Sequence, residues 1–339
     1  MIIYTNKAAY ECFDEKLIPA GAVGFNPEDA QMFIAFASGA VEPFAYEAVM
    51  VNSDNFASVL AEENDNLFIC LESDIVIAEP ITLVPGSVVN MDLNNFSISA
   101  ADGISYAGGL ITVPHGASLT VKGDGTFDSG AGVMSPFQMT SKALADDSKE
   151  AVLVINGGKF IGRDYIICGN GLAGRGNSHV VINGGEFEAG TTIIYNPQEN
   201  SSVIINDGNF VGQKCGIEMR SGDLEINGGK FVGMDAPTEV SPNGNGTTTE
   251  GTAIAVCQHT TKNPINVVIN DGEFEGYHAF YQANPQKNDE AAVALINLEI
   301  NGGKFTAIND GTMPVYSENK EKFIKGGVFA PAVDEKYMA

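Results

Sequence analysis

Residues 151–160 read AVLVINGGKF, and six later segments repeat this pattern of alternating apolar residues, a glycine turn and a phenylalanine. The copies are VLVINGGKF ending at Phe160, HVVINGGEF at Phe187, SVIINDGNF at Phe210, DLEINGGKF at Phe231, NVVINDGEF at Phe274, NLEINGGKF at Phe305 and KFIKGGVF at Phe329. LTVKGDGTF, ending at Phe127, is an earlier and less regular copy. The spacing varies from 21 residues, between Phe210 and Phe231, to 43, between Phe231 and Phe274. A fixed motif at a variable period indicates stacked units joined by loops of different length.

Each copy has the composition of a strand followed by a corner. The β-branched residues alternate with other residues, which favours a strand over a helix. The Gly-Gly or Asp-Gly pair tolerates a positive φ and therefore a sharp turn. No run between copies has the length and period of a crossover helix. We therefore predict an all-β fold, a right-handed single-stranded parallel β-helix (a solenoid) whose coils stack about 4.7–4.9 Å apart.

Stacking in register would place equivalent motif residues over one another. The residue directly before the phenylalanine never has the same charge in two successive copies. Like charges directly opposite each other would destabilise paired strands. The residues at this position are Lys159, Glu186, Asn209, Lys230, Glu273, Lys304 and Val328. We expect an internal asparagine ladder from Asn156, Asn183, Asn206, Asn227, Asn270 and Asn301. We expect a second stack, inside the bore, from Phe160, Phe187, Phe210, Phe231, Phe274 and Phe305. Ladders of this kind stabilise stacked strands, so these residues are predicted to be structural.

The chain divides into two parts in this interpretation. Residues 1–50 lack the repeat and are rich in aromatic residues, which indicates a small β-rich module that either caps the helix or attaches it to a partner. Residues 51–339 form the β-helix, with coils at about 66–330. A short helix at about 53–64, with Ser53 as its N-cap, is expected to close the open end of the bore. An insertion at Ser129–Glu150 is a candidate for another short helix.

The charge of the chain limits its partners. Of 339 residues, 43 are acidic and 18 basic, which gives a net charge of −25. Such a surface repels phosphate backbones, so we expect neither nucleic acid nor an anionic membrane as a partner. The N-terminal residues lack the pattern of a secretory signal peptide, which predicts synthesis in a cytoplasm without general export. The five cysteines show no C-x-x-C spacing and are expected to be reduced and buried.

Catalytic and metal-binding patterns are weak. The four histidines lie far apart and no phosphate-binding loop is present, so we expect no metal and no cofactor. Asp207 and Asp271 occupy the same turn position two copies apart, which falls near the carboxylate separation of inverting glycosidases. Aspartate is also a good turn former at this position, and we favour that explanation. Weak catalytic candidates remain: Asp164, Arg220 and Asp271.

A polar and aromatic stripe is the strongest candidate for ligand binding. A strand with a polar end follows most copies of the motif, in segments such as CGN, YNP, EMRSG, CQH, YQAN and YSEN. Stacked, these ends would form a surface for an extended glycan from Tyr195, Arg220, Gln258, His259, Gln282 and Tyr316. An ordinary solvated edge would have the same composition, and we favour that alternative.

The repeats resemble those of the pectate-lyase-like superfamily of right-handed parallel β-helices. The copies look like the N-G-G-x-F repeats of phage and gut-bacterial surface proteins. The segment NLFICLESDIVIAEPITLVPGSVVNMDLNNFSIS (Asn66–Ser99) is similar to the first coil of such domains. The resemblance covers about residues 53–339 and implies the fold. It implies no single function, since this fold carries lyases, hydrolases, adhesins and inert shafts. The catalytic motifs of pectate lyases and polygalacturonases are not found in the sequence.

We therefore expect a non-enzymatic structural or attachment protein. The best-fitting form is a phage virion component (head fibre, capsid decoration protein or tail spike) that binds other capsid or tail proteins through residues 1–50 and is trimeric. It would leave the host by lysis. Two alternatives stay open: a polysaccharide depolymerase, either a lyase or a glycoside hydrolase, and a glycan-binding adhesin at a bacterial surface, its signal peptide having been removed.

Overall fold

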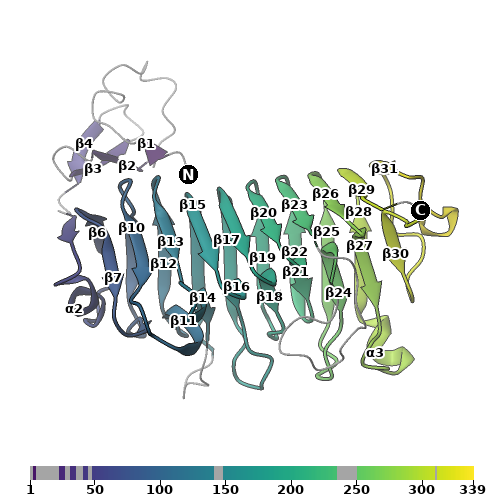
Figure 1. Ribbon diagram of the computed structural model, residues 1–339, viewed down its shortest axis with the longest axis horizontal. Coiled ribbons are helices and arrows are strands. Elements are labelled where there is room, and N and C mark those ends of the chain that lie inside the picture. The colour runs from purple at the N-terminus through teal and green to yellow at the C-terminus, as the bar shows by residue number, and fades with distance from the viewer. Residues whose placement is uncertain are drawn as a thin grey trace.

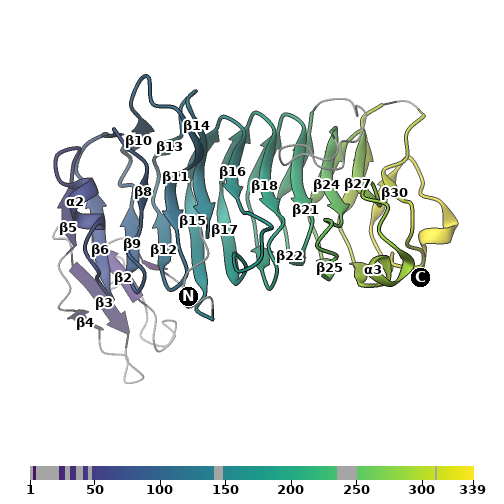
Figure 2. The ribbon, with the colours of Figure 1, turned by 90° about the horizontal axis from the view of Figure 1, so that it is seen from below.

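The computed structural model describes the side chains of residues 48–140, 148–234, 250–309 and 311–339. For residues 3–4, 23–26, 31–35 and 41–44 it describes the backbone alone. The coils stack along one axis, with the first coil at one end and the C-terminus at the other (Figures 1 and 2). All pairings between these coils are parallel. The chain is thus an all-β parallel β-helix, as the repeat predicts.

Each coil has three faces, because a coil contributes up to three strands that pair with their equivalents in the coils on either side. Strands of the first face carry the apolar run before the asparagine: β5 (Val49–Val51), β6 (Leu67–Leu71), β9 (Val88–Asp92), β12 (Ser118–Lys122), β15 (Ala151–Gly162), β17 (Ser178–Ala189), β19 (Ser202–Ile205), β22 (Gly222–Ile226), β25 (Ile265–Ile269) and β28 (Ile296–Ile300). β15 and β17 continue around the corner and join the first and second faces into one sheet of 18 strands.

The second face begins with the motif phenylalanine and its neighbours. Besides the ends of β15 and β17, it contains β7 (Ile75–Ile77), β10 (Ser97–Ala100), β13 (Thr126–Asp128), β20 (Asn209–Gly212), β23 (Lys230–Gly233), β26 (Glu273–Gly276), β29 (Lys304–Ala307) and β31 (Val328–Ala330). The third face is a separate sheet of nine strands. It contains β8 (Ile81–Thr82), β11 (Tyr106–Val113), β14 (Val133–Met139), β16 (Tyr165–Cys168), β18 (Thr192–Asn196), β21 (Cys215–Met219), β24 (Thr252–Cys257), β27 (His278–Ala283) and β30 (Val315–Ser317).

Four N-terminal strands form a sheet of their own, in the order β1 (Ile3–Tyr4), β2 (Val23–Asn26), β3 (Gln31–Ala35) and β4 (Val41–Phe44). β1 and β2 are parallel, and β2, β3 and β4 form an antiparallel meander. This sheet matches the β-rich module expected at the N-terminus. β5 already belongs to the sheet of the helix, where it pairs with β6.

From Phe127 onward each coil places one phenylalanine in the bore, beside aliphatic residues of the same core. From Phe160 to Phe329 the ring centroids of successive coils lie 4.6–5.2 Å apart, and the rings are within 16° of parallel. The phenylalanines from Phe127 to Phe305 are fully buried. The ring spacing equals the distance between parallel strands, so stacking and backbone pairing reinforce each other.

The asparagine ladder is present, but it lies on the outside of the helix. Each amide donates to the side-chain oxygen of the previous coil at 2.7–3.0 Å, from Asn183 to Asn301. Five of the six asparagines are exposed, and Asn156 is half-buried. The expectation of an internal ladder was wrong because side chains alternate along a strand. Ile155 points inward, so the next residue must point outward.

The charged lane keeps the predicted register, in which Lys159 faces Glu186 and Lys230 faces Glu273. The ion pairs nevertheless run diagonally. The Lys159 Nζ lies 2.8 Å from a carboxylate oxygen of Glu188, two residues further along the next strand, and Lys230 likewise approaches Glu275 at 3.6 Å. The hydrogen bond to Glu188 raises the pKa of Lys159.

Both ends of the bore are closed. Helix α2 (Phe56–Leu60) lies beside the first coil (Figure 1). Its Phe56 and Leu60 are buried in the core. At the other end, η1 (Glu335–Tyr337) buries Tyr337 against Phe323, with ring centroids 5.5 Å apart. The N-cap of α2 is Asn55, so the assignment of Ser53 was wrong. Ser53 instead accepts a hydrogen bond from Val76 N, on β7, at 3.0 Å.

The insertion at Ser129–Glu150 differs from expectation. Residues 133–139, in the insertion expected to hold a helix, form strand β14; residues 141–147 lie outside the described residues. A short helix that the sequence reading missed, α3 (Glu290–Ala294), follows β27, and its N-cap Asp289 accepts from Ala292 N at 3.0 Å. Among the described residues, no helix is long and apolar enough to cross a membrane.

Candidate functional site

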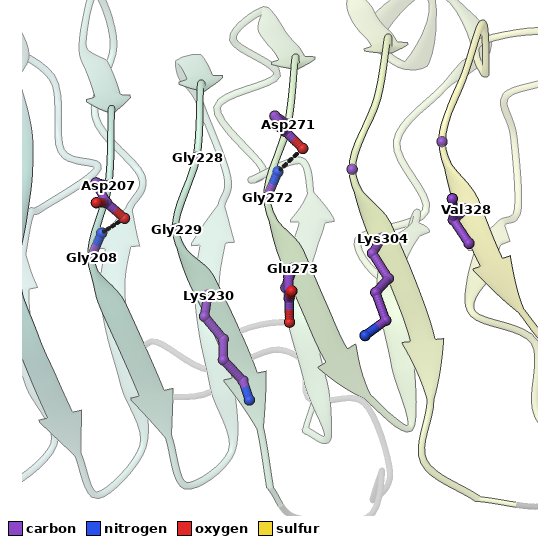
Figure 3. Close-up of a pocket in the computed structure, with 12 residues that line it drawn as sticks. Asp207, Gly208, Gly228, Gly229, Lys230, Asp271, Gly272, Glu273, Lys304 and Val328 are labelled. Atoms are coloured by element: carbon purple, nitrogen blue, oxygen red, sulfur yellow. Dashed lines mark hydrogen bonds between the residues drawn. The ribbon is translucent and has the colours of Figure 1, made fainter.

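A shallow groove of about 820 Å³ lies along the corner between the first and second faces (Figure 3). Glycines of successive coils form its floor, and Lys230, Glu273 and Lys304 stand along one side. Asp207 and Asp271 each accept a hydrogen bond from the N–H of the following glycine at 2.8 Å (Figure 3). The carboxylates are therefore engaged in their own turns. The ladder from Asn206 through Asn227 to Asn270 places the two aspartates two coils apart, or about 9.5 Å.

The three weak catalytic candidates lie at three different corners of the coil. Asp164 is in the turn between the second and third faces, where Arg163 binds it at 2.6 Å. Arg220 follows β21, at the turn from the third face to the first, and Asp271 lies at the corner between the first and second faces. Groups on separate corners cannot converge on one scissile bond. The structure does not bring these candidates together.

The predicted polar stripe divides into two sets of residues. On the third face the register pairs Tyr195 with Glu218 and Tyr281 with Tyr316. Ala255 joins the two pairs, and the whole lane is Cys168, Tyr195, Glu218, Ala255, Tyr281 and Tyr316. Tyr316 is 36% exposed, so this lane lies on the outer side of the third face. We call it the outer lane.

The two glutamines of the predicted stripe are interior residues. Gln282 is fully buried and accepts hydrogen bonds from Ser317 Oγ at 2.6 Å and Asn319 N at 3.2 Å. Gln258 is buried and donates to the carbonyls of Asn263 and Ala292, both at 2.9 Å. The expectation that these side chains face a ligand was wrong. They fasten the turns that lead from the third face back to the first.

The polar side chains at and beside the first part of the outer lane are buried or half-buried. Arg220 is 1% exposed, and its Nη1 lies 3.5 Å from the hydroxyl of Tyr195. Glu218, on the same strand, is fully buried. Burial raises the pKa of Tyr195, against the opposing effect of the Arg220 charge. His259 is half-buried and its pKa is lowered by burial and by Arg220. Because Arg220 is buried, it does not offer its guanidinium to a surface ligand.

At the end of the outer lane, Tyr281 and Tyr316 lie beside two further rings, those of Tyr277 and His278. We call these four residues the terminal aromatic cluster. Tyr281 and Tyr316 stack at 5.2 Å between centroids and 19° between planes. The His278 ring lies 5.5 Å from Tyr281 and 5.6 Å from Tyr316. Tyr277 meets His278 edge-on at 5.2 Å. Only Tyr316 of this cluster was among the predicted ligand-binding residues.

The other members of the cluster could not be predicted from the sequence because the turns before the third face differ in length. The residue of the outer lane follows the motif phenylalanine by eight positions at Tyr195 (187 to 195), by seven at Tyr281 (274 to 281) and by eleven at Tyr316 (305 to 316). The register of the third face is therefore not a fixed offset from the motif. The only signal in the sequence is the tyrosine at the polar end of successive strands.

The described residues contain no group of three or more His, Cys, Asp or Glu side chains placed to hold a metal ion. The described cysteines, Cys70, Cys168, Cys215 and Cys257, are buried free thiols. Burial raises the pKa of Cys168 to about 12, so it stays a thiol at neutral pH. Comparison with protein-family models, with characterised proteins and with solved structures found no match.

Proposed function

We propose that this chain is a structural or attachment protein whose β-helix serves as a rigid shaft. The observation that carries the proposal is the unbroken pair of ladders, one of phenylalanine in the bore and one of asparagine on the corner. The most regular residues of the sequence are thus used to hold coil on coil. Hydrolases and lyases of this fold use a pair of facing carboxylates or a bound metal ion. The catalytic candidates Asp164, Arg220 and Asp271 lie on separate corners and form no such pair, and the described residues contain no metal-binding cluster.

The more specific form of the proposal is a phage virion component: a head fibre, a capsid decoration protein or a tail spike. The resemblance of the repeats to those of phage and gut-bacterial surface proteins of the pectate-lyase-like superfamily supports it. So does the separate N-terminal sheet of β1 to β4, which would bind capsid or tail proteins. Trimerisation belongs to the same proposal.

The test is to look for the chain in purified particles. Mass spectrometry of gradient-purified virions should detect its peptides in a fixed ratio to the major capsid protein. Sedimentation velocity of the full-length chain should show a trimer. A monomer that is missing from particles would contradict the proposal.

A carbohydrate ligand is a second possibility, favoured by the terminal aromatic cluster. An adhesin would bind glycan without altering it, whereas a depolymerase would release new reducing ends or unsaturated products. Incubating the protein with neutral and acidic polysaccharides and measuring both products separates these functions. If catalysis occurs, Asp164→Ala and Asp271→Ala would show whether either corner contributes to it.

A further inference from the structure

Strands β27 and β30, which carry Tyr281 and Tyr316, belong to the last coils of the helix, at the end far from α2 (Figure 1). β30 is the terminal strand of the third sheet, and no further strand of the described part of the chain pairs with its outer edge. One face of the Tyr316 ring stacks on Tyr281, and no later strand places a side chain against the other face. The ring is correspondingly 36% exposed. It is an aromatic surface held from behind by a second ring.

Polar groups lie beside this ring. Glu318 directly follows β30 and, like Tyr316, is exposed. The charge of Glu318 contributes to the raised pKa of Tyr281, so the carboxylate lies near that phenol. Glu318 is exposed, and its Oε2 accepts from Asn284 N at 2.7 Å. A carboxylate held in place by a backbone N–H is a good acceptor for hydroxyl groups.

Burial keeps two members of the cluster, Tyr281 and His278, uncharged at neutral pH. Burial raises the pKa of Tyr281 to about 12, so its phenol stays protonated. Burial lowers the pKa of His278, and the ring is neutral. The Nδ1 of His278 lies 2.7 Å from the carbonyl oxygen of Met313 and must carry the proton, which leaves Nε2 as an acceptor.

We propose that the terminal aromatic cluster binds a neutral glycan, with one pyranose ring stacked on the free face of Tyr316. A pyranose has an apolar face of C–H groups that suits an aromatic ring, and hydroxyls at its rim that suit Glu318. A neutral ligand fits because the chain carries a net charge of −25, which repels anionic polymers. The proposal rests on the attachment function above: the shaft would present its sugar-binding end away from α2 and the first coil.

Tryptophan supplies a direct test, because the chain contains none. Tyr316→Trp places a single fluorophore at the proposed contact. Titration of the full-length variant with hexasaccharides of glucose, mannose and N-acetylglucosamine should give a saturable shift of emission with at least one of them. Tyr106→Trp is the matched control, since Tyr106 is 41% exposed on the same face near the other end. Its emission should not respond.

Affinities measured by calorimetry should then distinguish loss of a sugar contact from loss of folding. With the responding sugar, Tyr316→Ala should weaken affinity at least tenfold, and Tyr316→Phe should keep most of it because the ring remains. Unchanged thermal melting shows that the alanine variant is folded. Equal affinity of wild type and Tyr316→Ala, or no response to any of the three sugars, overturns the proposal. Detection of the chain in virions together with that result would leave the shaft function standing.

Discussion

The two glycines of the corner, such as Gly184 and Gly185, differ in how much space surrounds them. Gly185 has φ +124, and a Cβ there would meet Gly158 O at 3.0 Å and Phe187 Cζ at 3.1 Å. Gly184 has no atom within 4 Å of the position that a Cβ would take. In this copy only the second position requires glycine. The first position is not open in every copy, because a Cβ at Gly228 would meet Asn206 O at 2.7 Å. Aspartate takes the first position in Asp207-Gly208 and Asp271-Gly272.

We predict that Gly185→Ala lowers the free energy of unfolding by about 1–3 kcal/mol, because a side chain must enter a left-handed conformation against a backbone oxygen. Gly184→Ala should change it by no more than about 0.5 kcal/mol. Urea denaturation followed by circular dichroism measures both. Equal losses in the two variants would show that the corner constrains both glycines alike.

The neutral state of His278 predicts how stability depends on pH. Its pKa is lowered in the folded chain, so the unfolded chain binds more protons in the window just below the ordinary value of 6.5. The free energy of unfolding should therefore fall as pH drops from 7 to 5. His278→Gln cannot titrate and should flatten this part of the profile. His259, whose pKa is lowered as well, would keep part of the slope. A profile of His278→Gln that runs parallel to wild type would contradict the assignment.

At the scale of elements, the details of the short helices could be determined only from the structure. A helix near residue 56 was predictable from its apolar residues, but its N-cap was not, because Ser53 and Asn55 are both acceptable caps. Packing decides between them. Ser53 binds the open edge of β7, and Asn55 is left to begin the helix. α3 was missed because it is a five-residue helix within a turn.

We predict that Phe56→Asp opens the N-terminal end of the bore. Phe56 is 1% exposed, and its loss from a packed core costs about 3–5 kcal/mol, before the added cost of a buried charge. Exposing the first coil should also promote self-association through the strand edges, visible as larger species in sedimentation. Ala57→Asp, at the exposed neighbouring position, is the control and should leave the chain unchanged.

At the scale of the whole molecule, each coil contacts its neighbours and little else. Stability in such a solenoid is approximately a sum of terms for coils and for the interfaces between them. The phenylalanine stack is continuous through the interior coils, and Phe231 lies near its middle. Disruption there should affect coils on both sides, whereas disruption at the terminal Phe329 should affect one.

Phe231→Ala should therefore reduce hydrogen-exchange protection in β19, β20, β25 and β26, and lower the free energy of unfolding by about 3–5 kcal/mol. Phe329→Ala, at a half-buried ring, should lower protection only in β29 and β31. Exchange measured by mass spectrometry resolves these segments. Loss of protection over the whole chain in both variants would mean that the solenoid unfolds as a single unit.

The sequence by itself determined the solenoid, the register of its corner and the stack of phenylalanines. It could do so because the strand period, the glycine turn and the phenylalanine are local and repeat in every coil. The structure decided the side on which the asparagines lie, the diagonal ion pairs, the burial of Arg220, Gln258 and Gln282, and the gathering of His278, Tyr281 and Tyr316. The side of the asparagines and the diagonal ion pairs follow from the alternation of side chains and from their reach across paired strands. The burial of Arg220, Gln258 and Gln282 and the gathering of the aromatic residues depend on turn lengths that differ between coils, so only the three-dimensional winding of the chain brings those residues together.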